Sequence, residues 1–552
     1  MNGAPLAVIM LGSRGSGVAV NVRGGDLDQL LLMPPSVRDW LPDDHLAFFV
    51  LDVVAELDVA PFLRVYRLDG RGGAVYDPAM MLAVLLYAYC TGERSSRRIE
   101  RRLDEDVAYR VLAVNQRPDH ATLARFRRRH QDAIAGLFGQ VLALCVKAGL
   151  VDSGLVAIDG TKIAANASFF ANRDREDLEK IAAEILDDAE KTDAAEDELF
   201  GDRRGGELPA GWKGGRDRRH RIREALSELD RQTSRDFETR MVERAEKEAA
   251  LGHKLTGPKP KQDAARRAAP RRANTTDPHS RVIPQASKGV VQGYNAQAAA
   301  TADQVVVAAE VTATTNDQTQ FVPMATAVKE NLADAGHADA VGVFLADAGY
   351  WSAANATTDV GADVLIATRK TAWRKADKPD DDKLAVLAKV NRGELSQRQA
   401  GEILSVSYTW IRDMTKRYFG REGQRLTRTA APEPDEWIPV IERLARGEIS
   451  KRAARDELTA SDRRVNTMLA HVRGEAVDPS IARRAMDAKL AEPANTELYK
   501  KRQHSIEPVF GNIKANLGYR RFARRSFPAV NSEWRLICAA HNILKLRRTG
   551  LA

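Results

Sequence analysis

The chain has 552 residues, of which 44% are hydrophobic and 29% are charged, and its formal net charge is +8. This composition excludes a disordered protein, and the length predicts several globular domains rather than one compact core. Three isolated cysteines exclude a disulfide framework and a zinc cluster, and the longest apolar run is too short to cross a membrane, so we expect a cytoplasmic protein with no membrane partner.

The N-terminal part is expected to be helical after a loose start. Residues 1–25 are rich in glycine and lack the pattern of a signal peptide, so we expect a loose tail. Residues 26–150 favour an all-helical domain, in which Pro78 begins an apolar helix and Asp119 caps a helix over 121–130.

Basic side chains gather on two of these expected helices. One cluster lies at 94–102, and the other includes Arg125 and Arg128. Short helices with arginine-rich faces suit contact with DNA, so Arg125 and Arg128 are candidate DNA-binding residues. A plain helical bundle with its arginines in solvent is the alternative.

Strand patterns begin at Gly154 and predict a mixed sheet covered by helices. Short apolar runs alternate with helical patterns, and they lie at 155–158, 163–164, 290–301, 304–311, 341–346 and 364–367. This alternation is typical of an α/β domain, which we expect to consist of residues 151–380 together with 495–552. One run ends at Asp159 and another at Asp347.

A charged helical insertion into this domain is predicted at 171–270. Leu178 in one half, and Ile222 and Leu229 in the other, belong to patterns with helical spacing on either side of a turn. Residues 252–280 are rich in Pro and Arg and show little periodicity, so we expect a flexible segment there.

Asp317 is expected to have only a structural role. It precedes a helical pattern, and Gln320 follows three residues later, which is the arrangement of a capping box. Its carboxylate is therefore predicted to accept hydrogen bonds from the backbone of that helix.

A tandem repeat occupies most of 381–475. The segment from Arg392 to Leu404 recurs from Arg446 to Leu458, at an offset of 54 residues. Each copy has a serine that can cap a first helix, a small alanine where a neighbour can approach, and a serine that can cap a second helix: Ser396, Ala400 and Ser407, then Ser450, Ala454 and Ser461. Each copy therefore predicts a helix-turn-helix.

In DNA-binding helix-turn-helix units, the second helix enters the major groove. The exposed candidate DNA-binding residues on the two second helices are Arg412, Lys416, Arg463 and Arg464. The alternative is a pair of helical hairpins that pack only on protein.

The C-terminal part is predicted to be helical and basic. Pro508 predicts a helix start near Glu507, and Pro528 starts a further helix that continues toward the C-terminus. The candidate DNA-binding residues of this part are Lys514, Arg520 and Arg521.

The segment from Tyr499 to Lys514 carries the most specific pattern in the chain. Glu507 and Lys514 are almost two helical turns apart, so both side chains would lie on one face. Their spacing is too long for a local ion pair. Glu507 can therefore face metal ions while Lys514 meets a phosphate or a base, and Tyr499 and Arg502 supply further donors. An ordinary amphipathic helix is the alternative.

Asp159, Asp347 and Glu507 together would form a cage of oxygen ligands. The two aspartates end apolar strands, at the edge of a sheet where ligands gather. Hard oxygen ligands suit Mg²⁺ and Mn²⁺, and two such ions about 4 Å apart can activate a water or a 3′-hydroxyl at a phosphodiester. Each aspartate taken alone is also typical of a turn or a helix cap.

These motifs resemble those of DDE transposases of bacterial insertion sequences, in which a Tyr, an Arg, the catalytic Glu and a Lys recur in this order. Tyr499, Arg502, Glu507 and Lys514 match that signature, with an interval from Arg502 to Glu507 that is one residue longer than usual. Ala157-Ile-Asp159-Gly-Thr and Leu345-Ala-Asp347-Ala-Gly-Tyr-Trp resemble the first and second catalytic motifs. Parts of 26–150 resemble the helical N-terminal domain of the same group.

The resemblance implies an RNase H-like core in which Asp159, Asp347 and Glu507 are catalytic and bind the metal. The supporting residues would be Tyr499, Arg502 and Lys514. It also implies Mg²⁺-dependent nicking at the ends of the element, joining of the 3′-hydroxyls to target DNA, and a homodimer that holds two ends of double-stranded DNA. Such an enzyme would be associated with the nucleoid. In this family an insertion often separates the second Asp from the Glu, and the repeat at 381–475 fills that place.

Two other functions are compatible with these residues. A DNA-binding regulator derived from a transposase would bind DNA through the repeat without cleaving it. An RNase H-like nuclease would cut DNA without joining it. The presence of all three acids favours an enzyme over the regulator, and the family resemblance favours the transposase over the nuclease.

Overall fold

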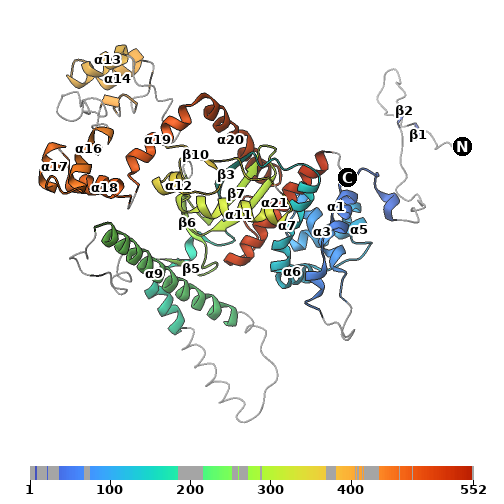
Figure 1. The fold of residues 1–552 in the computed structure, drawn as a ribbon. Coiled ribbons are helices and arrows are strands. Elements are labelled where there is room, and N and C mark those ends of the chain that lie inside the picture. The colour runs from blue at the N-terminus through green and yellow to red at the C-terminus, as the bar shows by residue number, and fades with distance from the viewer. Residues whose placement is uncertain are drawn as a thin grey trace, which may run out of the picture.

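The computed structural model of the protein combines helices with one mixed sheet of several strands (Figure 1), which is an α/β arrangement. It describes residues 7–8, 21–22, 37–66, 75–184, 215–251, 259, 272–285, 289–337, 339–368, 381–404, 406, 410–412, 414–415, 434–458, 460–474 and 477–549. Within these residues, no helix is both long and apolar enough to cross a membrane.

The described residues from 37 to 147 are helical apart from their connecting loops, as predicted. The helices are η1 (Val37–Trp40), α1 (Leu46–Glu56), α2 (Ala60–Leu63), α3 (Pro78–Cys90), α4 (Ser96–Glu105), α5 (Val107–Leu112), α6 (His120–Arg129) and α7 (Gln131–Lys147). The predicted cap is confirmed, because the Asp119 carboxylate accepts the Thr122 N–H at 2.6 Å. Helix α3 is apolar around its whole circumference and is therefore buried at the centre of this part. Ahead of it, β1 (Ala7–Val8) pairs with β2 (Asn21–Val22) inside the segment expected to be loose.

The sheet has parallel strands on one side and antiparallel strands on the other. Its strands are β3 (Leu155–Ala164), β6 (Arg281–Gln285), β7 (Gly289–Thr301), β8 (Val306–Thr312), β9 (Val343–Ala346) and β10 (Asp363–Ile366). The order is β10–β9–β3–β7, and β6 and β8 both pair with β7. Strands β3, β9 and β10 are parallel, whereas β7 runs antiparallel to β3, β6 and β8.

The sequence predicted that this strand ends at Asp159, but strand β3 extends further. It continues to Ala164, because Asp159 to Ala164 pair with Ala298 to Gly293 of β7. Only the parallel pairing with β9 stops here, after the pair Ile158 and Ala346. Asp159 and Asp347 therefore follow at the same level on neighbouring strands.

Each face of the sheet carries its own apolar core. Leu155 and Ala157 of β3 contribute to a core shared with α3 and α21 (Phe527–Arg548), whereas Val156 and Ile158 contribute to a core shared with α11 (Phe321–Asp334). This alternation follows from the period of two in a strand. After β9, Ser352 caps the short helix α12 (Ala353–Thr357).

The helix that carries Glu507 begins earlier than Pro508 suggested. Helix α20 (Pro493–Gly511) contains Pro508 in its interior, and a π-helical turn, η6 (Asn512–Asn516), follows it. A proline inside a helix leaves the carbonyl four residues earlier without its bond. Here the Gln304 side chain donates to the His504 carbonyl at 3.0 Å, which satisfies that oxygen and lets the helix continue. Helix α19 (Pro479–Ala491) precedes α20.

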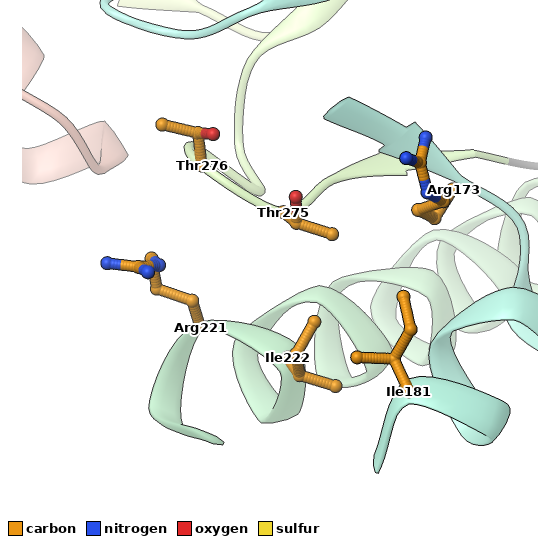
Figure 2. A pocket seen from close by; sticks show the side chains of 6 residues that line it. All are labelled: Arg173, Ile181, Arg221, Ile222, Thr275 and Thr276. Carbon is orange, nitrogen blue, oxygen red and sulfur yellow. The ribbon is translucent and has the colours of Figure 1, made fainter. Parts of the chain in front are cut away.

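The charged segment forms a helical hairpin attached to a small strand pair. Residues 175–184 pack on α9 (Gly215–Leu251) through apolar positions that include Leu178, Ile222 and Leu229. Strand β4 (Asn172–Arg173) pairs with β5 (Ala273–Asn274) at its base. Figure 2 shows Ile181 and Ile222 pointing toward Thr275 in a pocket with Arg173 and Arg221 on either side. Part of the segment expected to be flexible is thus structured, because Asn274 and Asp277 are buried and hydrogen-bonded there.

The two copies of the repeat have the same local structure where both are described. Helices α13 (Asp381–Asn391) and α14 (Gln397–Leu404) correspond to α16 (Pro434–Ala445) and α17 (Lys451–Glu457), and α18 (Asp462–Val472) follows in the second copy. Gly393 and Gly447 both have a left-handed backbone, with φ of 78° and 76°. Ala400 and Ala454 are fully buried, which confirms the close approach expected of these small residues.

Candidate active site

Asp159 and Asp347 lie side by side where β3 and β9 stop pairing. The Asp159 carboxylate accepts the N–H of Gly160 at 2.7 Å, and the Asp347 carboxylate accepts the N–H of Gly349 at 2.8 Å. Burial, and then the neighbouring charge of Asp347, raise the pKa of Asp159 to about 6. The negative charge of Asp347 makes ionisation of Asp159 less favourable, because the two carboxylates repel each other. A cation bound between them would relieve this repulsion.

Helix α20 brings a cation and a third carboxylate to this pair, since it packs on β3, β7 and β9. The Arg502 guanidinium donates to Asp159 Oδ2 at 3.2 Å, and its other nitrogen lies 3.9 Å from Glu507 Oε1. Arg502 is 15% exposed, whereas Glu507 is 50% exposed. The Tyr499 hydroxyl donates to the Ala346 carbonyl at 3.0 Å, directly before Asp347. Arg502 therefore lies next to both Asp159 and Glu507, and Asp347 lies beside Asp159.

Lys514 lies in the π-helical turn η6, which follows the helix that carries Glu507. Its ammonium group donates to the Thr161 hydroxyl and, at 3.1 Å, to the Lys162 carbonyl. Burial lowers the pKa of Lys514, and the charges of Lys162 and Arg520 lower it further. Lys514 therefore connects η6 to β3 beside the carboxylates and adds positive charge there.

Asp317 is not a helix cap, so that prediction is wrong: its side chain makes no capping hydrogen bond. Its carboxylate instead accepts from Lys162 at 3.1 Å, from Asn295 at 2.6 Å and from Gln297 at 2.9 Å. The Tyr350 hydroxyl donates to the side-chain oxygen Oε1 of Gln297. Gly160, the residue after Asp159, pairs with Gln297 across the sheet. The polar cluster therefore packs directly against Gly160.

The sequence contained one signal for this cluster. Asn295 and Gln297 are polar and fully buried at alternate positions of an alanine-rich strand, and they pair with Lys162 and Gly160. Polar side chains at alternate positions share one face of a strand. Their burial requires a partner on that face, and Asp317 provides it.

The donor set fits a hard divalent cation. Asp159, Asp347 and Glu507 offer only oxygen ligands, and such ligands suit Mg²⁺ or Mn²⁺. The described residues contain no group of three His, Cys, Asp or Glu side chains that could hold a metal ion in this conformation. The Arg502 guanidinium lies between Asp159 and Glu507. Its positive charge therefore compensates the two carboxylates, and its side chain separates Glu507 from Asp159 and Asp347.

The candidate DNA-binding residues are distributed over several surfaces. Arg125 and Arg128 are exposed on α6, Arg412 is exposed in the first repeat, and Arg521 is exposed beside the end of β3. Arg520 is also exposed, although it donates to the Lys514 carbonyl at 3.1 Å. Lys416 and the side chain of Arg463 lie outside the described residues.

Arg464 is not the exposed residue that the repeat predicted. Its guanidinium is paired with the buried Asp478, donates to Ser480 at 2.6 Å, and lies 5.4 Å from the centre of the Trp437 ring. These contacts join the second repeat to the start of α19. Arg464 therefore has a structural role between these two parts of the chain.

Two segments of the chain match known protein families. Residues 35–129 match the family described as Transposase domain (DUF772), and residues 468–547 match the family described as Transposase DDE domain. The second segment contains Glu507, whereas Asp159 and Asp347 lie between the two matched segments. No curated protein and no solved structure matched the chain. The two family matches support the assignment of this chain to the DDE transposases of the insertion-sequence type.

Proposed function

We propose that this protein cleaves the ends of its insertion sequence and joins the 3′-hydroxyls to target DNA. The observation that carries the proposal is that Asp159 lies beside Asp347 at the end of their strand pairing, while Arg502 contacts both Asp159 and Glu507. Three carboxylates with a shared cation suit phosphoryl transfer to water or to a DNA hydroxyl, which requires no Ser, Cys or His nucleophile.

An RNase H-like core is part of the proposal. The strand order β8–β7–β3–β9–β10 supports it, because three successive antiparallel strands, β3, β7 and β8, are followed by two strands parallel to β3. Helix α11 connects the two halves of this sheet. The candidate carboxylates lie where the central strand leaves its parallel neighbour, which is a usual place for a ligand in an α/β sheet.

In this proposal Asp159, Asp347 and Glu507 would hold two Mg²⁺ ions, with Mn²⁺ as a substitute. Bound divalent ions activate the attacking hydroxyl and stabilise charge on the leaving oxygen. Arg502 orients Asp159 and keeps it ionised beside Asp347, while Tyr499 fixes the backbone that carries Asp347. Lys514, with Arg520 beside it, adds positive charge next to the acids, where a DNA phosphate would lie.

The remaining parts of the chain would bind DNA. We propose that the repeat at 381–475 consists of two helix-turn-helix units inserted into the catalytic domain, 151–380 with 495–552, and that the helices at 26–150 contact DNA through Arg125 and Arg128. Similar caps and buried alanines in both copies support two equivalent units. A homodimer on two element ends, associated with the nucleoid, completes the proposal.

The test uses duplexes that carry the sequences flanking the gene, incubated with the protein and either Mg²⁺ or Ca²⁺. A transposase produces nicks at a fixed position and products joined to a second DNA. A nuclease produces nicks without joined products, and a regulator binds without nicks. Either of the last two results would replace the proposed function.

A further inference from the structure

A basic cavity lies between the N-terminal helices and the loop that precedes α21. It encloses about 370 Å³. Arg127 and Arg128 reach it from α6, and Arg524 and Arg525 reach it from the loop. None of the described residues that line it is acidic. We call this the arginine cavity.

The loop side of the arginine cavity is held in place by hydrogen bonds. The buried Glu533 carboxylate of α21 accepts the N–H groups of Ala523 and Arg524, both at 2.9 Å. The Asn166 side chain donates to the Ala523 carbonyl at 2.7 Å, and Arg525 donates to the Asn166 carbonyl at 2.8 Å. A wall fixed in this way loses little conformational entropy when a ligand binds.

The helix side is held in the same way. Arg524 donates to the Gln131 side chain of α7 at 3.0 Å, and Arg127 donates to the Arg94 carbonyl at 2.7 Å and to the Ser96 hydroxyl. Arg128 forms no ion pair with another described residue, and its side chain is exposed. The cavity is therefore a preformed junction between the two parts of the chain.

The charges at this junction are poorly balanced. Burial lowers the pKa of Arg524, and the charges of Arg127 and Arg128 lower it further. The nearby acid is Glu533, whose oxygens already accept backbone N–H groups. Four guanidinium groups around one cavity with one such carboxylate leave a positive potential that favours an anion.

We propose that the arginine cavity binds a backbone phosphate of double-stranded DNA. Guanidinium groups match phosphate oxygens with paired hydrogen bonds, and backbone phosphates are the contacts that set a protein's register on a duplex. The first turn of α21, at Ser526 and Ala529, also lines the cavity, so its backbone dipole adds to the attraction. This inference rests on the proposed function, because it takes DNA as the substrate.

The structure also limits how far the bound phosphate can lie from the cleavage site. Asn166, which accepts the Arg525 hydrogen bond, follows Asp159 by seven residues along β3 and its extension. At about 3.3 Å per residue this separation is at most about 23 Å. A DNA strand rises about 3.4 Å per nucleotide. The bound phosphate is therefore within about seven nucleotides of the phosphate cleaved at the carboxylates.

The pocket in Figure 2 is a weaker candidate for the same role. It offers Arg173 and Arg221, but Ile181 and Ile222 form part of its lining. Arg173 also donates to the carbonyls of Phe170 and Asn172, at 2.8 and 2.9 Å. The arginine cavity has twice as many cations, so the test concentrates there.

The experiment measures how binding of a duplex of about 40 base pairs depends on salt, using the full chain without divalent ions. Arg128→Ala and Arg525→Ala remove exposed side chains, so the fold is expected to survive, as circular dichroism would verify. Each lost phosphate contact reduces the slope of log K against log salt by about 0.9, so the double variant, which loses the one bound phosphate, should lose up to about 0.9. The matched control is Lys147→Ala, which removes one exposed charge at the other end of α7.

An unchanged slope in the double variant, or an equal loss in the control, overturns the proposal.

The second arm places single neutral methylphosphonates along the duplex that is cleaved. One position within about seven nucleotides of the cleavage site should weaken binding of the wild type and not of the double variant. The transposase function is scored separately by Mg²⁺-dependent cleavage, so a failed slope test with intact cleavage rejects the cavity alone. If the double variant loses slope as expected but the wild type does not cleave, the transposase function is rejected and the arginine cavity is retained.

Discussion

Replacement of Gly160 by alanine is expected to impair the candidate site through a purely steric effect. Gly160 follows Asp159 in β3 and is not among the residues with positive φ, so its backbone conformation suits alanine. An added Cβ would lie 2.8 Å from Asp317 Oδ1 and 3.0 Å from Asn295 Oδ1, and closer still to the Gln297 amide. Ordinary carbon to oxygen contacts are about 3.3–3.6 Å.

The structure sets the size of the effect. The strand or the cluster must move by roughly 0.5–1 Å, and overpacking of this kind costs about 1–3 kcal/mol in the free energy of unfolding. For a domain of this size, each 1 kcal/mol lowers Tm by about 2–4 °C. Because Asp159 is the adjacent residue, a shift near 1 Å would lower the cleavage rate by about 100-fold.

The assay compares melting temperature and Mg²⁺-dependent cleavage in Gly160→Ala with those in Gly136→Ala. Gly136 lies inside α7, and an added Cβ there meets nothing within 4 Å. Alanine at that position is expected to stabilise the helix by about 0.5–1 kcal/mol and leave cleavage unchanged. If Gly160→Ala melts and cleaves like the wild type, the polar cluster does not support Asp159.

Three further predictions concern a buried histidine, the site arginine and the repeat. Burial lowers the pKa of His541 to about 4 from 6.5. Its stabilisation is therefore present above about pH 6.5 and is lost as the pH falls toward 4, by about 3 kcal/mol at ~1.4 kcal/mol per unit. Chemical denaturation should show a smaller loss in His541→Gln, and equal losses would refute this. Arg502→Ala should cleave about 10- to 100-fold more slowly with unchanged DNA affinity, because it loses a charged hydrogen bond worth about 1.5–3 kcal/mol, whereas Arg502→Lys should lose less; wild-type rates in both variants would remove Arg502 from the site. Replacement of residues 385–475 by a flexible linker should weaken duplex binding and flatten its salt dependence, and unchanged binding would make the repeat a packing element.

Local features of the sequence predicted the elements that depend on local interactions. The cap at Asp119, the apolar helix from Pro78 and the strands at 289–301 and 343–346 follow from nearest neighbours and from periodicity. Glu507 was singled out because its surrounding pattern is specific, and its helix places it next to Arg502, which pairs with Asp159.

The errors arose where a distant residue decides the local structure. Pro508 stays inside a helix because Gln304, far away in the chain, satisfies the carbonyl that the proline leaves without a partner. Strand β3 continues past Asp159 through polar residues because β7 pairs with them and Asp317 neutralises Lys162. Asp317 and Arg464 were both misassigned from their neighbours in the sequence, since their partners come from other elements.

The convergence of the three carboxylates is tested most directly by measuring cleavage and joining of end DNA by Asp159→Asn, Asp347→Asn and Glu507→Gln in Mg²⁺. Each substitution keeps the size of the side chain and removes its charge, so fold and DNA affinity should be retained. The proposed site predicts that all three variants bind the duplex like the wild type and give neither nicks nor joined products. Cleavage at the wild-type rate by any one of them would contradict a single site built from these three acids.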